Sequence, residues 1–264
     1  IFVGDVSFES GPDGMFPSND LSQSLLDLNI PLRRFKTGTP PRIDGRTVDY
    51  SKMVPQYGDD DEEGFTFKSD HNPPKNELSC WLTYTNERTH QLIHEAMPRS
   101  PLYNGTIDGV GPRYCPSLED KVMRFPEHTS HHVFLEPEGY NSDLIYPNGI
   151  STSFGSDVQD KWIRTIPGLE NAQIVRYGYA IEYDAIDARA LNDKLQSKDL
   201  PFLFFAGQIT GVEGYIESAA SGILSGLNAA LMLEGKEIGD TVEITVIRSG
   251  EEITVELVIS EYHP

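Results

Sequence analysis

Residues 202–222 constrain the fold of this chain more than any other segment. Four apolar residues at 202–205 are typical of a buried parallel strand, and a turn with Gly207, Gly211 and Gly214 follows them. Glycine lets a backbone approach a flat ligand where a Cβ would clash. The small residues after the turn predict a helix whose free N–H groups and positive dipole end face that ligand. A tight turn without a ligand is the alternative, because one glycine motif is weak evidence.

The negative charge on the pyrimidine edge of a reduced flavin is the kind of charge that such a helix end stabilises. The turn also carries a Gln-Thr pair, Gln208 and Thr210 flanking Ile209, which a bare strand-to-helix turn does not need. A flavin is therefore the ligand that we expect at this turn.

The composition fits a folded chain with one large domain or two ordinary ones. At 264 residues the chain can bury a sizeable core. No apolar run approaches the roughly 18 residues of a membrane span, so we expect no membrane association. The chain opens on Ile1 in what reads as mid-strand sequence, so we expect an excised or incomplete piece. The absence of a charged-then-apolar leader and the two distant cysteines predict a reducing, cytoplasmic location.

The net charge of −20 excludes a protein that binds nucleic acid with its whole surface. A polyanion such as tRNA would need a local basic patch. The sequence contains one candidate, formed by Arg33, Arg34, Lys36, Arg42 and Arg46.

Periodicity and turn residues predict an α/β fold. One helix is expected to begin at residues 18–20, with leucines at 21, 25, 26 and 28. Further helices are expected at 86–97, at 158–166 and from the glycine turn to residue 233. Strands are expected at 32–35, 78–85 and 173–183, and another is expected within 101–111. Residues 37–42 read as a stiff loop, and residues 121–136 as strands joined by a polar turn. Alternation at 241–246 and 253–259 predicts a β-hairpin.

Two groups of metal-binding side chains occur, and we interpret neither as a metal site. The carboxylate run at 59–63 is typical of a solvated loop. His128, His131 and His132 lack a fourth ligand at suitable spacing, so we expect exposed, unliganded histidines.

Residues 109–121 are dense in chemically capable groups. Arg113 can grip a phosphate or carboxylate with two hydrogen bonds, and Lys121 adds a point charge. Cys115 lies two residues from Arg113, and a nearby cation favours the reactive thiolate. A capped helix beginning near Ser117, with a buried thiol before it, is the alternative. Cys80 follows an apolar-strand pattern and reads as a packed thiol.

Eight further motifs are distributed along the chain: GPDG at 11–14, RFKTGTPPR at 34–42, CWLTYTN at 80–86, GPRYCPSLEDK at 111–121, FLEPEG at 134–139, YPNGIS at 146–151, RTIPGLE at 164–170 and YAIEYD at 179–184. Over residues 1–232 the chain resembles the glucose-inhibited division protein A family. These are flavin-dependent enzymes that install the 5-carboxymethylaminomethyl group on the wobble uridine (U34) of tRNA.

The resemblance implies a partial FAD-binding domain of the glutathione-reductase type. Residues 1–45 and 176–233 would belong to it, and residues 46–175 would form an inserted mixed α/β domain associated with the nicotinamide cofactor. Residues 234–264 would be a β-rich hairpin tail, and they resemble the last strands of a PDZ domain from a trimming serine protease.

The resemblance also implies residue roles, cofactors and partners. FAD would contact Gly207, Gln208, Gly211, Gly214 and Tyr215, and tRNA would meet Arg34, Lys36 and Arg42. The NAD segment would comprise Gly111, Pro112, Arg113, Tyr114, Cys115, Pro116, Ser117, Leu118, Glu119, Asp120, Lys121, Val122, Met123, Arg124 and Phe125, with Cys115 as the catalytic thiol. In the family, NADH reduces the flavin, methylenetetrahydrofolate supplies the carbon that is transferred to C5 of the uridine, and the enzyme is a homodimer with a GTPase partner.

Three departures leave the activity of this piece open. The glycine-rich loop for the flavin pyrophosphate belongs upstream of Ile1, so we expect weak flavin retention and no competent tRNA modification. Residues 209–221 are more similar to the sibling family, the folate-dependent tRNA uridine-54 C5-methyltransferase. Residues after 234 stand where the family has the helical domain that docks the GTPase. Three readings follow: the wobble-uridine enzyme, the methyltransferase, and a cofactor-free remnant that binds tRNA or a partner through residues 33–46.

Overall fold

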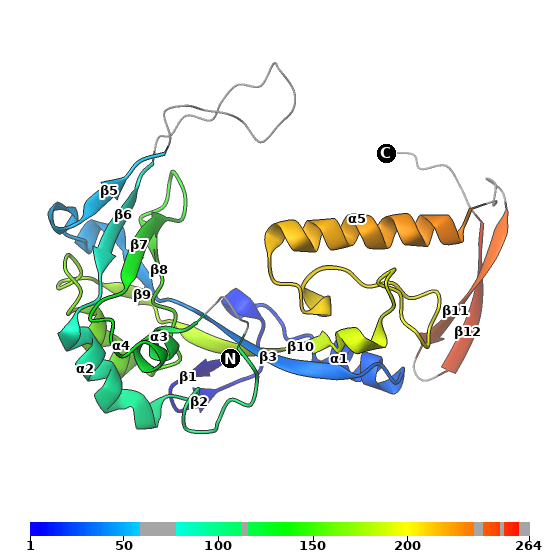
Figure 1. The fold of residues 1–264 in the computed structure, drawn as a ribbon, viewed down its shortest axis with the longest axis horizontal. Coiled ribbons are helices and arrows are strands. Elements are labelled where there is room, and N and C mark those ends of the chain that lie inside the picture. Colours follow the sequence, from blue (N-terminus) through cyan, green and yellow to red (C-terminus); the bar gives the residue numbers. More distant parts are fainter. Residues whose placement is uncertain (59–77, 112–115, 235–239, 249–250, 259–264) are drawn as a thin grey trace, which may run out of the picture. The chain divides into compact units, whose positions relative to one another are not determined.

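The computed structural model describes residues 1–58, 78–111, 116–234, 240–248 and 251–258, and these have a mixed α/β fold (Figure 1). The chain divides into two compact units. The first unit contains Ile1–Pro17 and Phe35–Glu182, and the second contains Ser18–Arg34 and Tyr183–Pro264. Two strands, β3 (Leu32–Thr39) and β10 (Tyr179–Ile186), pass from one unit into the other.

A six-stranded sheet with the order β5-β6-β7-β8-β4-β9 forms the centre of the first unit. Its strands are β4 (Arg42–Asp44), β5 (Val54–Gln56), β6 (Cys80–Tyr84), β7 (His132–Pro137), β8 (Leu144–Asn148) and β9 (Ile174–Arg176). Every neighbouring pair is antiparallel. A second sheet has the order β2-β1-β10-β3, with β1 at Phe2–Val3 and β2 at Val6–Ser7.

Three helices accompany the six-stranded sheet: α2 (Glu87–Ala96), α3 (Leu118–Arg124) and α4 (Ser156–Ile163). A capping box starts α2 at Asn86 and another starts α3 at Ser117, because each of these side chains accepts the N–H three residues later and satisfies a helix donor that lacks a partner. Trp162 and Phe154 are the largest fully buried side chains in the core of this unit.

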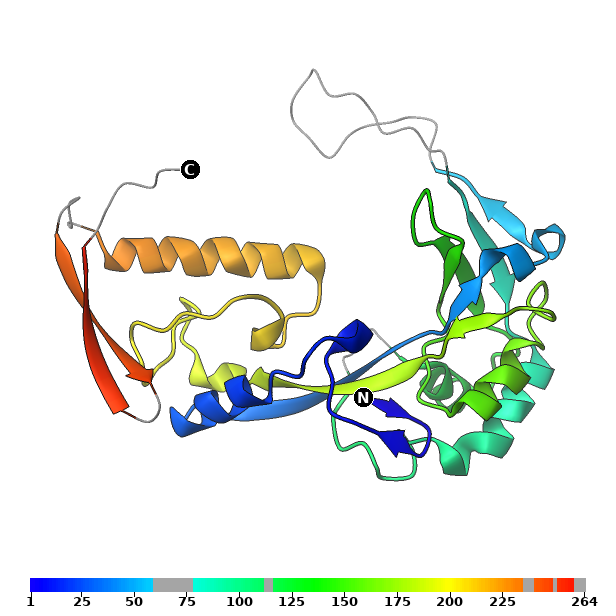
Figure 2. The same ribbon diagram turned by 180° about the vertical axis from the view of Figure 1, so that it is seen from behind.

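The second unit contains α1 (Asn19–Asp27), the short 3-10 turn η6 (Gly207–Thr210), the long helix α5 (Tyr215–Met232) and the hairpin of β11 (Thr241–Arg248) with β12 (Glu251–Val258). Its core consists of Leu25, Ile30, Ile186, Leu191 and Phe205. Figure 2 shows α5 as a straight helix that follows the η6 turn. No helix of the described residues is long and apolar enough to cross a membrane.

Most predicted elements are confirmed, including the helices that became α1, α2, α4 and α5 and the strands that became β6, β9 and β10. The predicted hairpin near the C-terminus is also present. Residues 37–39, expected as loop, instead extend β3.

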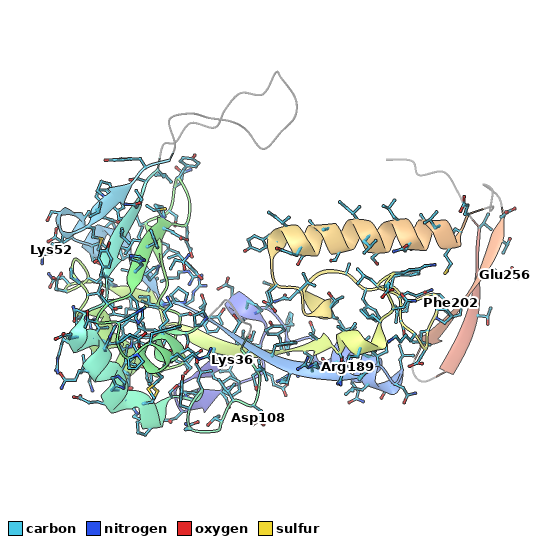
Figure 3. The ribbon with its side chains drawn as sticks, viewed as in Figure 1. Lys36, Lys52, Asp108, Arg189, Phe202 and Glu256 are labelled. Carbon is cyan, nitrogen blue, oxygen red and sulfur yellow. The ribbon has the colours of Figure 1, made fainter. Side chains whose placement is uncertain are left out.

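Two further predictions are wrong, and the strand expected in 101–111 is reduced to one isolated bridge of Val110 with Phe35. Residues 202–205 do not form a buried parallel strand: Phe204 makes one isolated antiparallel bridge to Gln196, and Phe202 is 57% exposed (Figure 3). The N–H of Leu203 donates to the carbonyl of Leu200 across Pro201, so a turn consumes the start of the apolar run. Residues 121–124, expected as strand, belong to α3 because its capping box directs them into a helix.

Candidate functional site

The glycine turn of the second unit is held in a conformation that requires glycine. Gly207 has φ +74° and Gly211 has φ +82°, which is the left-handed region where a side chain is strained. No atom of the described residues lies within 4 Å of a Cβ placed on Gly207, so open space borders the backbone there. A flat ligand can therefore reach this backbone closely.

Hydrogen bonds fix the turn to the first turns of α5. The N–H of Gly207 donates to Oγ of Ser221 (2.8 Å), and Oγ of Ser218 donates to the carbonyl of Val212 (3.1 Å). Gly214 is the N-cap residue of α5 and has no side chain to cap it. Tyr215 follows with 95% of its side chain exposed. The predicted flavin-contacting residues thus lie together around one helix start.

A second group of functional side chains surrounds Asp120, at the start of α3 in the first unit. Its Oδ2 accepts from Nζ of Lys36 (3.0 Å) and from the N–H and Oγ of Ser117 (3.2 Å each), while its Oδ1 accepts from the hydroxyl of Tyr103 (3.0 Å). Burial alone would raise the pKa of Asp120, but the hydrogen bond and charge of Lys36, with the bond from Tyr103, outweigh burial and lower it. Burial and the charge of Asp120 raise the pKa of Tyr103 to about 12. At pH 7 Asp120 is therefore a carboxylate and Tyr103 a neutral phenol.

Glu119 is the neighbouring carboxyl and is fully buried. Its Oε1 accepts from Oγ1 of Thr152 (2.9 Å) and from the N–H and Oγ of Ser153 (2.8 and 3.0 Å), whereas Oε2 has no partner among the described residues. Burial raises the pKa of Glu119 in spite of these donors. Glu119 therefore ties α3 to residues 152–153 through Oε1, and its place in the nicotinamide segment stays a prediction.

A small hollow opens beside the Asp120 group. Its lining residues are Lys36, Thr37, Gly38, Leu102, Ser117, Thr152 and Ala180, and its empty space is about 230 Å³ including the part that is open to solvent. That volume is small compared with a pocket that encloses a whole drug-sized ligand.

The remaining residues of the predicted NAD segment have different environments. Pro112, Arg113, Tyr114 and Cys115 lie outside the described residues, so the catalytic and phosphate-binding assignments of Cys115 and Arg113 stay predictions. Leu118 and Val122 are in the core, while Met123 and Phe125 are exposed. Nζ of Lys121 donates to the carbonyl of Gly149 (2.7 Å), and Nη2 of Arg124 lies 3.5 Å from Oδ1 of Asp120.

Four of the five residues of the basic patch pair with carboxylates. Arg34 pairs with Asp184, Lys36 with Asp120, Arg42 with Glu138 and Arg46 with Asp44. The side chains of Lys36 and Arg42 are each 13% exposed, whereas that of Arg34 is 48% exposed. These pairs reduce the field that a polyanion would meet, and the tRNA role of the three predicted residues stays a prediction.

Sequence reasoning missed Tyr103 and Glu182. Oε1 of Glu182 accepts from the N–H groups of Asp108 and Gly109 (3.0 and 2.7 Å). No motif marks Tyr103, and the contact of Glu182 is with a segment that is remote in the sequence. Glu182 does belong to the YAIEYD motif, which is the only signal that pointed near it.

Two groups of potential metal ligands are interpreted from the sequence as unliganded, and the structure describes only one of them. The carboxylate run at 59–63 lies outside the described residues. In the part of the chain that the structure describes, no group of three or more His, Cys, Asp and Glu side chains could hold a metal ion. His131 departs from the prediction of exposed histidines, because it is half-buried and its ring stacks on that of His90 with 5.1 Å between centroids.

Comparison with known proteins identifies the family. The family model described as glucose inhibited division protein A matches residues 1–237. The chain belongs to this family. Residues after 237 lie outside the match.

Characterised relatives and a solved structure agree. The tRNA uridine 5-carboxymethylaminomethyl modification enzyme MnmG of Clostridium botulinum (strain Loch Maree / Type A3) is 55% identical over 237 residues, which are 90% of this chain and 38% of the relative. MnmG of Clostridium novyi is 52% identical over 90% of this chain and 37% of its own length. Aquifex aeolicus GidA in its form I crystal aligns with a TM-score of 0.80 and 44% identity over 90% of this chain and 40% of that chain. The chain thus spans less than half the length of these relatives.

Proposed function

We propose that this chain supplies the flavin- and nicotinamide-facing part of an enzyme that installs the 5-carboxymethylaminomethyl group on the wobble uridine of tRNA. The observation that supports the proposal most is 55% identity to MnmG over 237 residues, a span that includes both the glycine turn and the Asp120 group. Identity at this level over two separate sites favours a shared activity over a shared fold alone.

The proposal divides the chain by role. Residues 1–45 and 176–233 would contribute to the FAD-binding domain, and residues 46–175 would form the insert that meets NADH. The glycine turn fits a flavin because its backbone borders open space at Gly207 and α5 starts without a side-chain cap. Bound FAD would accept the electrons of NADH and support transfer of the folate-borne carbon.

The chain's own residues would bind and orient these groups. Gly207, Gly211 and Gly214 present backbone to the ring, and Gln208 offers an amide for hydrogen bonds to its edge. Arg113 would hold a phosphate or carboxylate of the nicotinamide cofactor, and Cys115 would be the reactive thiol. A GTPase partner and a homodimeric assembly belong to the proposal for the whole protein.

A chimera tests the proposal because it does not depend on where this chain begins. Residues 1–237 replace the matching region of C. botulinum MnmG, the chimera is produced in a strain that lacks this enzyme, and tRNA nucleosides are measured by mass spectrometry. We expect the 5-carboxymethylaminomethyl modification to return, to be lost with Cys115→Ser and to persist with Cys80→Ser. A folded, yellow chimera that leaves the wobble uridine unmodified would contradict the proposal, and a methylated uridine 54 would favour the sibling activity.

A further inference from the structure

We propose that the face of the six-stranded sheet that is turned away from α2, α3 and α4 binds unpaired RNA bases by stacking. The residues that carry the proposal are Tyr84, His132 and Phe134, and we call the surface that they form the ring face. The inference rests on the proposed function only in taking RNA as the partner. It deepens that function by naming a surface that holds the bases.

Alternation along β7 decides which side chains lie on the ring face. Val133 and Leu135 are fully buried, and they belong to the core that also contains residues of α2, α3 and α4. Successive side chains of a strand point to opposite faces, so His132 and Phe134 point away from this core. Tyr84 of β6 is the direct partner of His132 in the antiparallel ladder and therefore lies on the same face.

The side chains of the ring face are accessible. Tyr84 is 40% exposed, His132 is exposed and Phe134 is half-buried. Asn148 of β8, the partner of Phe134 on its other side, is exposed as well. Contiguous apolar surface that a folded chain leaves exposed is typical of a binding site.

The rings form one continuous row across β6 and β7, which are neighbours in the sheet (Figure 1). The centroids of Tyr84 and His132 are 5.1 Å apart, and those of His132 and Phe134 are 6.0 Å apart. Sheets that bind single-stranded RNA carry aromatic side chains on an open face, because each ring stacks on an unpaired base. Every base has a π-face, so such a row holds RNA with little regard to its sequence.

Two carboxylates follow the rings along the chain, and both have partners. Oε1 of Glu136 accepts from Nδ2 of Asn148 (2.9 Å), and Glu138 pairs with Arg42. The guanidinium of Arg42 also lies over the ring of Tyr146, 4.3 Å from its centroid. A basic peptide would compete with these partners for the carboxylates, whereas a base needs only a ring. The observations therefore favour bases over a basic peptide.

Stacking also suits the overall charge of the chain. The net charge of −20 limits what neutralisation of phosphates contributes to RNA binding. Contact between an aromatic ring and a base involves no ion pair, so the ring face contributes affinity in spite of that charge.

Two substitutions remove a ring and keep an apolar side chain, Tyr84→Leu and Phe134→Leu. Tyr84→Phe keeps the ring and removes only the hydroxyl. Phe8→Leu is the matched control, because Phe8 is 51% exposed in the same unit but follows β2 of the other sheet.

The measurement is fluorescence anisotropy of two labelled RNAs titrated with the whole chain over a salt series. One RNA is an anticodon stem-loop, whose loop bases are unpaired, and the other is a blunt duplex with the same number of phosphates. Tyr84→Leu and Phe134→Leu are each expected to weaken stem-loop binding by about fivefold or more at every salt concentration. The salt slope should keep its wild-type value because no phosphate contact is lost, and duplex binding should not change. Tyr84→Phe and Phe8→Leu should bind both RNAs as the wild type does.

Unchanged stem-loop affinity in both leucine variants would overturn the proposal, and so would a wild-type chain that does not bind the stem-loop. An equal loss with the duplex, or a loss that comes with a smaller salt slope, would also overturn it. A hexa-arginine peptide is titrated in parallel, and a loss of affinity confined to this peptide would assign the face to a basic partner instead. If Phe134→Leu does not fold, Tyr84→Leu decides the outcome. The assay requires neither flavin nor turnover, so a failure of the chimera to modify the wobble uridine leaves this result interpretable.

Discussion

At the scale of single residues, one buried and one half-buried imidazole, His90 and His131, carry an energetic penalty for protonation. His131 Nε2 is buried without a hydrogen-bond partner among the described residues, and burial, followed by the charges of His90 and Lys121, lowers its pKa to about 4. Burial and the charge of His94 lower the pKa of His90, and the charge of Glu87 partly offsets this shift. His90 Nε2 lies 2.8 Å from Oγ1 of Thr85, and that hydroxyl also accepts the N–H of His131. Thr85 can therefore donate its hydroxyl hydrogen to Nε2 of a neutral His90.

This pair predicts a loss of stability in mild acid. Between about pH 6.5 and 4 the unfolded chain binds protons that the folded chain excludes, so the free energy of unfolding falls as the pH drops through this window. Between pH 7 and pH 5, the melting temperature of the His131→Gln variant is expected to fall less than that of the wild type. His132→Gln, at an exposed neighbour, should keep the wild-type dependence. Equal shifts in all three proteins would show that other groups set the acid response.

At the scale of elements, local signals predicted the structure well where a cap or an alternation defines it. Asn86 at the start of α2 and the alternating strands β11 and β12 are examples. The run at 202–205 misled because a proline turn consumes part of it. The Asp120 group was only half predicted: Ser117 and Asp120 are three residues apart, whereas Lys36 and Asp120 are separated by 84 positions, a pairing that sequence spacing cannot encode.

Glycine-to-alanine substitutions in the η6 turn and in α5 are expected to have opposite effects on the free energy of unfolding. Gly211→Ala forces a Cβ into a left-handed conformation and should lower the free energy of unfolding by about 1–2 kcal/mol. Gly222→Ala, inside α5 with no described atom within 4 Å of the new Cβ, should raise it by about 0.5–1 kcal/mol. Urea denaturation measures both. A stabilising Gly211→Ala would mean that the turn does not keep its positive φ in solution.

At the scale of the whole molecule, the net charge is −20, and four of the five basic residues at 33–46 pair with carboxylates. Because binding of tRNA phosphates releases counterions, the logarithm of the affinity falls linearly with the logarithm of the salt concentration. The slope is proportional to the number of phosphate contacts. Arg34 is the most exposed of the three residues predicted to meet tRNA, and Lys36 and Arg42 are nearly covered.

Binding measured by fluorescence anisotropy over a salt series should separate these residues. Arg34→Ala is expected to reduce the slope of log affinity against log salt by about 0.7–0.9, the value of one phosphate contact. Lys36→Met should leave the slope unchanged, since its ammonium already serves Asp120. Arg88→Ala, an exposed arginine of α2, is the control. A drop of the same size with Lys36→Met would return that residue to the tRNA surface.

The division of the second unit into Ser18–Arg34 and Tyr183–Pro264 has a consequence for how the protein is made. Leu25 and Ile30 leave the ribosome about 150 residues before Ile186, Leu191 and Phe205, the side chains that complete their core. At about 5–20 residues per second this interval lasts roughly 8–30 s. During that time the apolar face of α1 has no native partner from its own unit, so we expect this face to stay accessible until the second half of the unit is synthesised.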